Sequence, residues 1–189
     1  GNSDFYNGAF PSEYSNALSG IFDMQIRNGN NQKYEHTFQL GILGIDLASE
    51  GPISRKHGSS YIFNYRFSTT SLATGNDMNL KYQDLSFKLN FPTRKAGTFS
   101  IWGIGLIDRY KPEAIDRDEW ETQGDRQSGN TAFDKAAGGL THKYLINADT
   151  YIRSSLAATY SKDRTRADQM TEDDKLVHVG DIRNSKWDI

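Results

Sequence analysis

The sequence contains no cysteine. That absence excludes a disulfide framework, a thiolate metal site and a cysteine nucleophile, and it is compatible with any compartment. No apolar run approaches the ~20 residues of a membrane-spanning helix. The chain also lacks a charge excess, because 24 acidic residues face 22 basic ones for a net charge of -2. We therefore expect no nucleic acid or other polyanion as a partner.

Recognisable catalytic and metal-binding motifs are missing as well. The four histidines, His36, His57, His142 and His178, are scattered, and no H-x-x-x-H or H-E-x-x-H pair exists. A lone histidine on a strand is more often an interface residue than a catalytic one. We therefore expect no catalytic residue, no metal site and no cofactor, and a protein that is not an enzyme.

What the chain does have is alternation, most clearly over Ser60–Thr70. The period of two predicts a β-strand with one aromatic and one polar face, and its length of about ten residues suits a tilted strand crossing a bilayer. A soluble sandwich would show the same alternation, although its core faces usually favour Val, Ile and Leu. The aromatic positions are Tyr61, Phe63, Tyr65 and Phe67, and the polar positions include Asn64, Arg66 and Ser68.

The neighbouring segments continue the pattern. Tyr82–Phe91 alternates cleanly, and Thr98–Tyr110 is apolar on both faces. Lys33–Glu50 alternates with a change of phase, which predicts a tight turn or bulge at Gly41–Gly44 because a slip of one residue flips every side chain. In Tyr82–Phe91 the apolar positions Leu85, Phe87, Leu89 and Phe91 are interleaved with Asp84, Ser86, Lys88 and Asn90.

Short and long connections between these segments are expected to alternate. The sequence suggests short turns at Gly51–Gly58, Pro92–Gly97 and Asn147–Thr150, and long connections after Thr70, over 111–137 and after Thr165. Outer-membrane barrels have this asymmetry, with short periplasmic turns and long extracellular loops. About seven barrel strands result, and an odd number cannot close a bacterial barrel. The tail from Arg166 is charged, with a weak strand at Lys175–Val179.

These features predict an all-β protein that forms a partial antiparallel transmembrane-type β-barrel. The expected hairpin around Asn147–Thr150 joins Gly138–Asn147 to Tyr151–Thr165. The segment 111–137 is too polar and too broken for a strand. Since unpaired strand edges cannot be satisfied in lipid, the chain is expected to be a fragment of a larger barrel, or the strand count to be off by one.

Three passages resemble one family. Asn7–Asn30, Gly44–Thr70 with the EGPI turn at Glu50–Ile53, and Tyr82–Trp102 are similar in order and spacing to TonB-dependent outer-membrane receptors. The similar branch often carries an N-terminal carboxypeptidase-regulatory-like domain. The resemblance implies that residues 1–30 are the C-terminal end of a plug domain. It also implies that residues 31–189 are the first strands of an incomplete outer-membrane barrel.

The resemblance further implies a fragment of an outer-membrane receptor for active nutrient uptake. Its partners would be outer-membrane lipid, an inner-membrane energy-coupling complex acting through the missing part of the plug, and a surface lipoprotein. Unpaired strand edges would also let copies of the fragment associate with one another. The alternative from another class is a soluble β-rich binding or adhesion module whose aromatic face packs against a second sheet.

Alternation and loop composition predict which side chains contact ligand, which face lipid and which face the barrel lumen. The acidic loop around Trp120 is a candidate ligand contact, although it departs from a calcium-loop pattern and a plain solvated loop is the alternative. The expected ligand contacts are Trp120, Asp116, Asp118 and Glu119. The expected lipid-facing residues are Tyr61, Phe63, Tyr65, Phe67, Leu85, Phe87, Leu89 and Phe91. The expected lumen-facing residues are Asn64, Arg66, Lys88, Asn90 and Arg153.

Overall fold

The protein is all-β, with 74% of the residues that the structure describes in strands. The computed structural model describes residues 3–8, 10, 19–42, 44–69, 79–111, 117–122, 126–171, 173 and 175–189. Within those ranges helical structure is limited to a short 3-10 turn, η2 (Arg117–Glu119), and to Arg126. Over the same ranges no helix has the length and apolar character needed to span a membrane.

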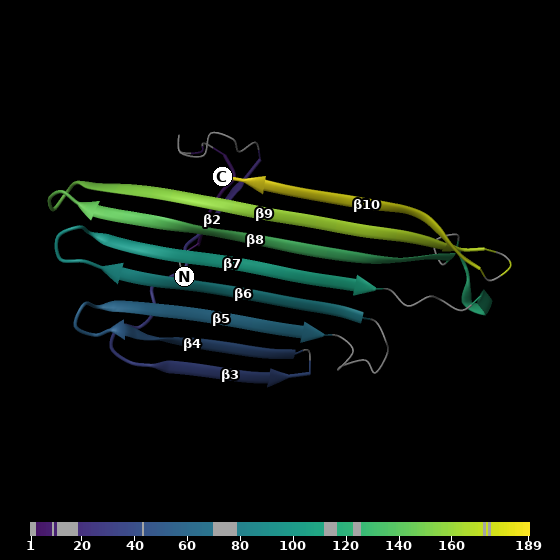
Figure 1. Cartoon of the computed structure of the whole chain (residues 1–189), viewed down its shortest axis with the longest axis horizontal. Helices are drawn as coiled ribbons and strands as arrows, with labels where there is room; N and C mark the ends of the chain where they lie inside the picture. Colours follow the sequence, from purple (N-terminus) through teal and green to yellow (C-terminus); the bar gives the residue numbers. More distant parts are fainter. Residues whose placement is uncertain are drawn as a thin grey trace.

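The strands form two separate sheets. A small one pairs β1 (Ser3–Tyr6) with β2 (Ile21–Met24) antiparallel. The other is an eight-stranded antiparallel sheet in which each strand lies beside its sequence neighbours (Figure 1). Its strands are β3 (Glu35–Gly41), β4 (Gly44–Ser54), β5 (Ser59–Thr69), β6 (Asn79–Pro92), β7 (Thr98–Lys111), β8 (Gln127–Leu145), β9 (Tyr151–Met170) and β10 (Leu176–Asp188).

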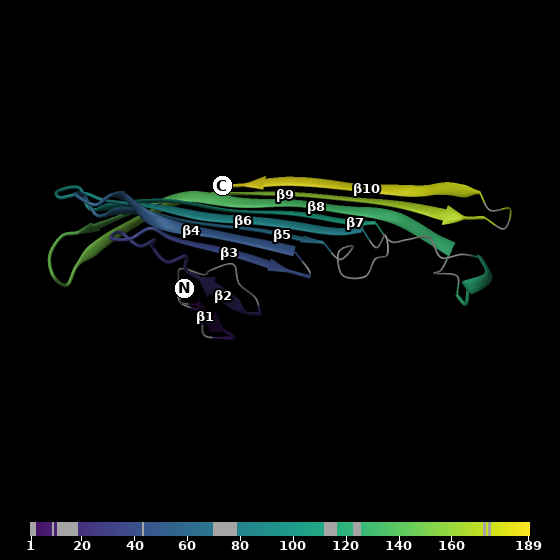
Figure 2. The ribbon, with the colours of Figure 1, turned by 90° about the horizontal axis from the view of Figure 1, so that it is seen from below.

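The large sheet is open. Its order runs from β10 to β3, so these two strands are its edges, and it does not close into a barrel. The small sheet lies to one side of the large one (Figure 2). No hydrophobic side chain among the described residues is buried. The hydrogen-bonded ladder, rather than an apolar core, therefore defines the fold, and one broad face of apolar side chains is left without a covering layer.

Local sequence explains the first hairpin. Gly41 pairs with Gly44, which confirms the tight turn predicted from the change of phase between Ile42 and Ile45. A side chain at Gly44 would clash, because its Cβ would lie 2.0 Å from the carbonyl oxygen of Phe67 on β5. Glycine lets β4 begin its pairing with β3 and β5 at the same residue.

The strand count of seven was wrong, because the large sheet has eight. The predicted loop 111–137 was too long, since β8 begins at Gln127, and most of the charged tail is β10. Both segments looked too polar for strands. Their backbone groups are nevertheless paired along full ladders, and Asp134 on β8 forms ion pairs with Arg109 on β7 and Arg164 on β9. Cross-strand pairs of opposite charge stabilise a sheet that propensity alone would not predict.

The connections fit the expected asymmetry only in part. The turns at 55–58, 93–97 and 146–150 lie at one end of the sheet, on the left in Figure 1. The connections 70–78 and 112–126 join strands at the opposite end, but so do the tight Gly41–Gly44 turn and residues 171–175. The first turn is also shorter than predicted, because β4 continues through Pro52 to Ser54 with a register shift that accommodates the proline.

Candidate functional site: the two faces of the sheet

Cross-strand register defines the first face of the large sheet. Residues directly opposite one another point to the same side, and side chains alternate along each strand. Tyr61 pairs with Leu89, Phe63 with Phe87 and Tyr65 with Leu85, while Phe91 pairs with Phe99 on β7. All the residues expected to face lipid therefore share one side, which we call the apolar face. What that side meets stays a prediction.

The apolar face continues over the other strands. Register rows extend it with Phe38, Leu40, Ile45 and Leu47 from β3 and β4, and with Ile101, Ile107, Leu140, Leu156 and Trp187 from β7 to β10. All of these side chains except Ile45 are exposed, with exposed fractions that run from 37% at Ile101 to 72% at Leu40. A contiguous apolar surface of this kind marks a membrane or protein contact.

Aromatic rings pack along the whole apolar face, with at least one ring in each of its rows. The Phe87 ring lies over Gly103, where an added Cβ would stand 2.6 Å from the ring. Towards the 93–97 turn, Phe99 stacks on His142 with centroids 4.3 Å apart. Towards the opposite end, Tyr160 meets Trp187 with centroids 4.5 Å apart. Phe63 and Phe87 lie in the middle row, so the rings cover the height of the band rather than its two ends alone.

The second face of the sheet is polar. Asn64, Arg66, Lys88, Asn90 and Arg153 all lie on it, since each shares a register row or an alternation phase with the others. Arg66 Nε donates to Asp46 Oδ1 at 2.6 Å on the neighbouring strand, and Ser100 Oγ donates to Asn90 Oδ1 at 3.1 Å. The assignment of this side to a barrel lumen stays a prediction.

A segment that precedes the large sheet docks on the polar face. Both guanidinium Nη groups of Arg27 donate to Glu50 on β4, and the Asn30 amide N–H donates to Glu50 Oε2 at 2.8 Å. Lys88 Nζ on β6 donates to the Ile26 carbonyl at 2.7 Å. A Cβ at Gly29 would lie 1.9 Å from the Tyr61 carbonyl oxygen, so only glycine fits this close approach to β5. Residues 26–30 therefore cross β4, β5 and β6.

The docking residues Arg27 and Glu50 were missed by sequence reasoning. The two residues are separated by 23 positions, and neither belongs to a recognisable motif. Glu50 was placed at the end of the alternating segment Lys33–Glu50 and at the start of the EGPI turn, whereas it lies within β4. The one available signal was the alternation itself, which places a carboxylate on the side opposite Ser49.

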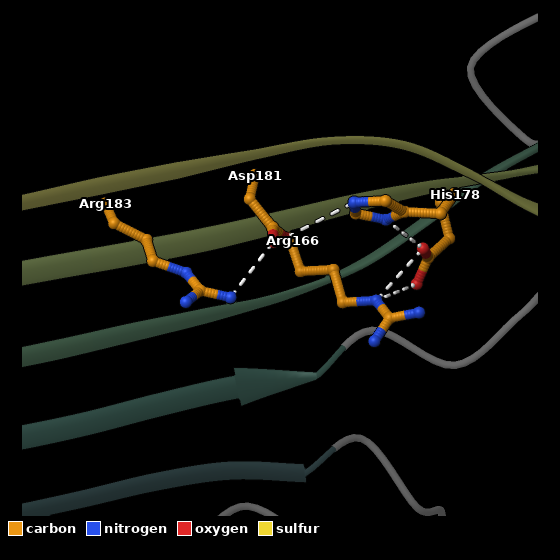
Figure 3. Close-up of polar contacts among 5 residues, drawn as sticks. Arg166, His178, Asp181 and Arg183 are labelled. Carbon is orange, nitrogen blue, oxygen red and sulfur yellow. Dashed lines mark hydrogen bonds and ion pairs between the residues drawn. The ribbon is translucent and has the colours of Figure 1, made fainter.

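A charged cluster occupies the apolar-face side of β9 and β10, beyond the apolar rows (Figure 3). Asp168 is only 7% exposed. It accepts hydrogen bonds from Arg166 Nε at 2.9 and 3.0 Å, and His178 Nδ1 lies 2.9 Å from its Oδ1. His178 Nε2 lies 3.6 Å from Asp181, which Arg183 binds at 3.0 Å.

Acidic and basic side chains alternate in this cluster. The hydrogen bond from His178 holds the pKa of the Asp168 carboxyl below its ordinary value, Arg166 adds to that effect, and burial opposes it. In the described part of the chain, no group of three or more histidine, aspartate or glutamate side chains is arranged to hold a metal ion. The cluster thus holds β9 and β10 together and concentrates cationic side chains at this end.

The candidate ligand loop is only partly described. Trp120 is half-buried, and the Arg126 guanidinium lies 5.2 Å from its ring centroid. Asp118 and Glu119 are exposed within η2, and Asp116 lies outside the described residues. Arg126, which sequence reasoning did not single out, covers part of the ring by a cation–π contact. The role of Trp120, Asp116, Asp118 and Glu119 in ligand contact stays a prediction.

The site therefore has three parts: an uncovered apolar face, a polar face with a docked segment, and a charged end. Serine–histidine contacts are also present, with Ser49 Oγ 3.0 Å from His36 Nδ1 on the apolar face and Ser54 Oγ 3.0 Å from His57 Nδ1 at the first turn. The contrast between the two faces suits contact with an apolar medium on one side and polar groups on the other. Comparisons with protein-family models, curated proteins and solved structures found no match to this chain.

Proposed function

We propose that the large sheet is an arc of an outer-membrane β-barrel, part of a TonB-dependent receptor for active nutrient uptake. The apolar face would contact lipid, and the polar face would line the lumen. The observation that carries this proposal is the broad apolar band that no described layer covers. In water such a surface would be costly, whereas in a bilayer it is the required lipid contact.

The dimensions of the band support the proposal. On β6 the apolar rows run from Phe91 to the level of Gln83, roughly 27 Å along the strand at about 3.3 Å per residue. With a barrel tilt of about 40°, this corresponds to a height of roughly 20 Å, close to the ~25 Å apolar band of outer-membrane barrels. Aromatic rings lie along the whole band, and charged rows follow it at the end next to the 112–126 connection.

The docked segment supports the assignment of the polar face. A plug fills the lumen of such a receptor, so the chain between plug and barrel must contact lumen-facing strands. Residues 26–30 lie against the polar face through Arg27, Glu50 and Lys88. An inner-membrane energy-coupling complex would act on the receptor through the plug, and a surface lipoprotein would be a further partner. Nutrient capture would involve the end of the sheet that includes Trp120.

The open edges require further strands. β3 and β10 each have one side with no partner strand among the described residues, and backbone groups left unpaired in lipid cost several kcal/mol each. The remaining strands of a closed barrel would satisfy them. Without those strands, copies of this chain would pair edge to edge.

The alternative, a soluble β-rich binding or adhesion module, requires a second layer over the apolar face. The small β1–β2 sheet does not supply it, because the chain that leads from β2 into the large sheet docks on the polar face. A separate partner protein would have to cover the apolar face, and detergent dependence distinguishes the two cases.

Tryptophan fluorescence tests the proposal. Trp187 lies on the apolar face and Trp102 on the polar face. We would refold two single-tryptophan chains into phosphatidylcholine vesicles. One keeps Trp187 (W102F and W120F), and its matched control keeps Trp102 (W120F and W187F). We expect brominated acyl chains to quench Trp187 more strongly than Trp102. Equal quenching, or a chain that stays monomeric and unfolds cooperatively in plain buffer, would reject the proposal.

A further inference from the structure

One register row just beyond the apolar band carries basic side chains on several strands. Lys81 on β6 pairs with Arg109 on β7, Arg109 with Ala132, Ala132 with Arg164 on β9, and Arg164 with Arg183 on β10. Residues paired in this way point to the same side, which is the apolar face. We call Lys81, Arg109, Arg164 and Arg183 the basic row.

The basic row follows directly on the apolar rows. Gln83 on β6 pairs with Ile107 on β7, and both belong to the last apolar row. Lys81 and Arg109 each lie two residues further along these strands. The step from one row to the next is roughly 6.7 Å along the strand. Most of the cationic groups on this side therefore lie about one row beyond the apolar surface, where a bilayer has its headgroups, while Lys162 lies in the row of Ile107.

Carboxylates on the same face do not neutralise the row and its surroundings. Asp134 is shared by Arg109 and Arg164, Asp181 binds Arg183, and Asp168 binds Arg166 and His178. The Arg183 side chain remains 75% exposed and that of Arg164 42% exposed. Lys111 and Lys162 have the same alternation phase and add further positive charge to this side.

The polar face at the same levels has a different balance. Asp46, Asp84, Asp108 and Asp163 lie there with Arg66, Lys135 and Lys186, so acidic and basic residues nearly balance. The excess of basic residues is thus confined to the face that also carries the apolar band. A general solubilising charge would not need to select one face.

We propose that the basic row docks the anionic phosphate headgroups of lipid that surrounds the apolar face. Guanidinium groups bind phosphate oxygens in pairs, and lysine adds a point charge. This inference rests on the proposed function, because it requires the apolar face to be in a bilayer. It adds a preference for anionic lipid at one defined level of the sheet.

The test measures partitioning of the full chain from urea into two kinds of vesicle, one of phosphatidylcholine and one with about 20% phosphatidylglycerol. The variant K81Q/R183Q removes the two ends of the basic row. The matched control K135Q/K186Q removes the same charge from one row of the polar face, where Lys135 and Lys186 both pair with Ser161. Both variants are made in the chain that keeps Trp187 alone (W102F and W120F). Quenching of Trp187 by brominated phosphatidylcholine then reports insertion into the bilayer separately from partitioning.

We expect phosphatidylglycerol to strengthen partitioning of the unmodified chain and of the control. In K81Q/R183Q the increase in the partition coefficient caused by phosphatidylglycerol should be roughly tenfold smaller, because each basic residue at an anionic surface contributes to binding. If K81Q/R183Q and K135Q/K186Q lose the phosphatidylglycerol effect equally, the inference is overturned. Continued quenching of Trp187 in that case would leave the barrel assignment intact. If excess inorganic phosphate at constant ionic strength abolishes the preference for phosphatidylglycerol vesicles, the inference is also overturned, and the basic row is a site for free phosphate. Absence of quenching in both lipids would overturn the proposed function itself.

Discussion

Arginine at position 87 is the most direct probe of the apolar face. Phe87 lies in the middle row of the band on β6, two rows from Phe91 and two rows from Gln83. Each of those distances is roughly 13 Å along the strand, or about 10 Å in height for a tilted strand. In a bilayer, F87R therefore places its charge near the midplane.

The expected cost is about 2–4 kcal/mol of unfolding free energy, the range for arginine at the midplane of an outer-membrane barrel. Loss of the Phe87 ring from its contact with Gly103 adds to this cost in any environment. The matched control S86R puts the same charge on the neighbouring residue of the same strand, which points to the polar face. We expect S86R to cost less than about 1 kcal/mol, because a surface substitution rarely costs more.

Equilibrium refolding in phosphatidylcholine vesicles, followed by Trp187 fluorescence against urea, measures both free energies. A depth series extends the test, since L89R and L85R should each cost less than F87R, and F91R least of all. Equal costs for F87R and S86R, or a flat depth series, would show that the apolar face does not lie in a bilayer.

Three further changes test the docked segment, the charged end and the close contacts between strands. E50Q removes the carboxylate that binds the docked segment, so amide exchange over residues 26–30 should accelerate by roughly tenfold, and unchanged protection would contradict the docking role. The lowered pKa of Asp168 means that its ionised form stabilises the fold fully above the ordinary pKa of about 3.9, and this contribution is lost as the pH falls through the lower folded value. Amide exchange in β10 should report that loss, and D168N should remove the acid dependence; an unchanged acid profile in D168N would assign it to another group. G139A should destabilise by roughly 1–3 kcal/mol in urea unfolding because its Cβ would lie 2.5 Å from a β9 carbonyl oxygen. The control G105A, with its nearest atom 4.0 Å away, should be neutral or slightly stabilising, and equal losses would contradict the steric argument.

Local alternation was enough to predict several strands and one turn. The segment around Phe63 and Asn64 has a period of two, and a period of two has no other regular solution than a strand. The phase change near Gly41 predicted the first hairpin for the same reason, since a strand must reverse before its apolar side can return to the same face. These predictions depended only on residues close together in the chain.

Only the tertiary structure decided the polar half of β8, the greater part of β10 beyond Val179 and the two charged features. Asp134 lies in a strand because Arg109 and Arg164 flank it across the ladder, and those partners are 25 and 30 positions away. Glu50 acquires its role from Arg27, which reaches the sheet only after the chain has crossed its polar face. The basic row likewise exists only through cross-strand register. Pairing between distant segments is set by the sum of many ladder contacts, so no short window of sequence contains it.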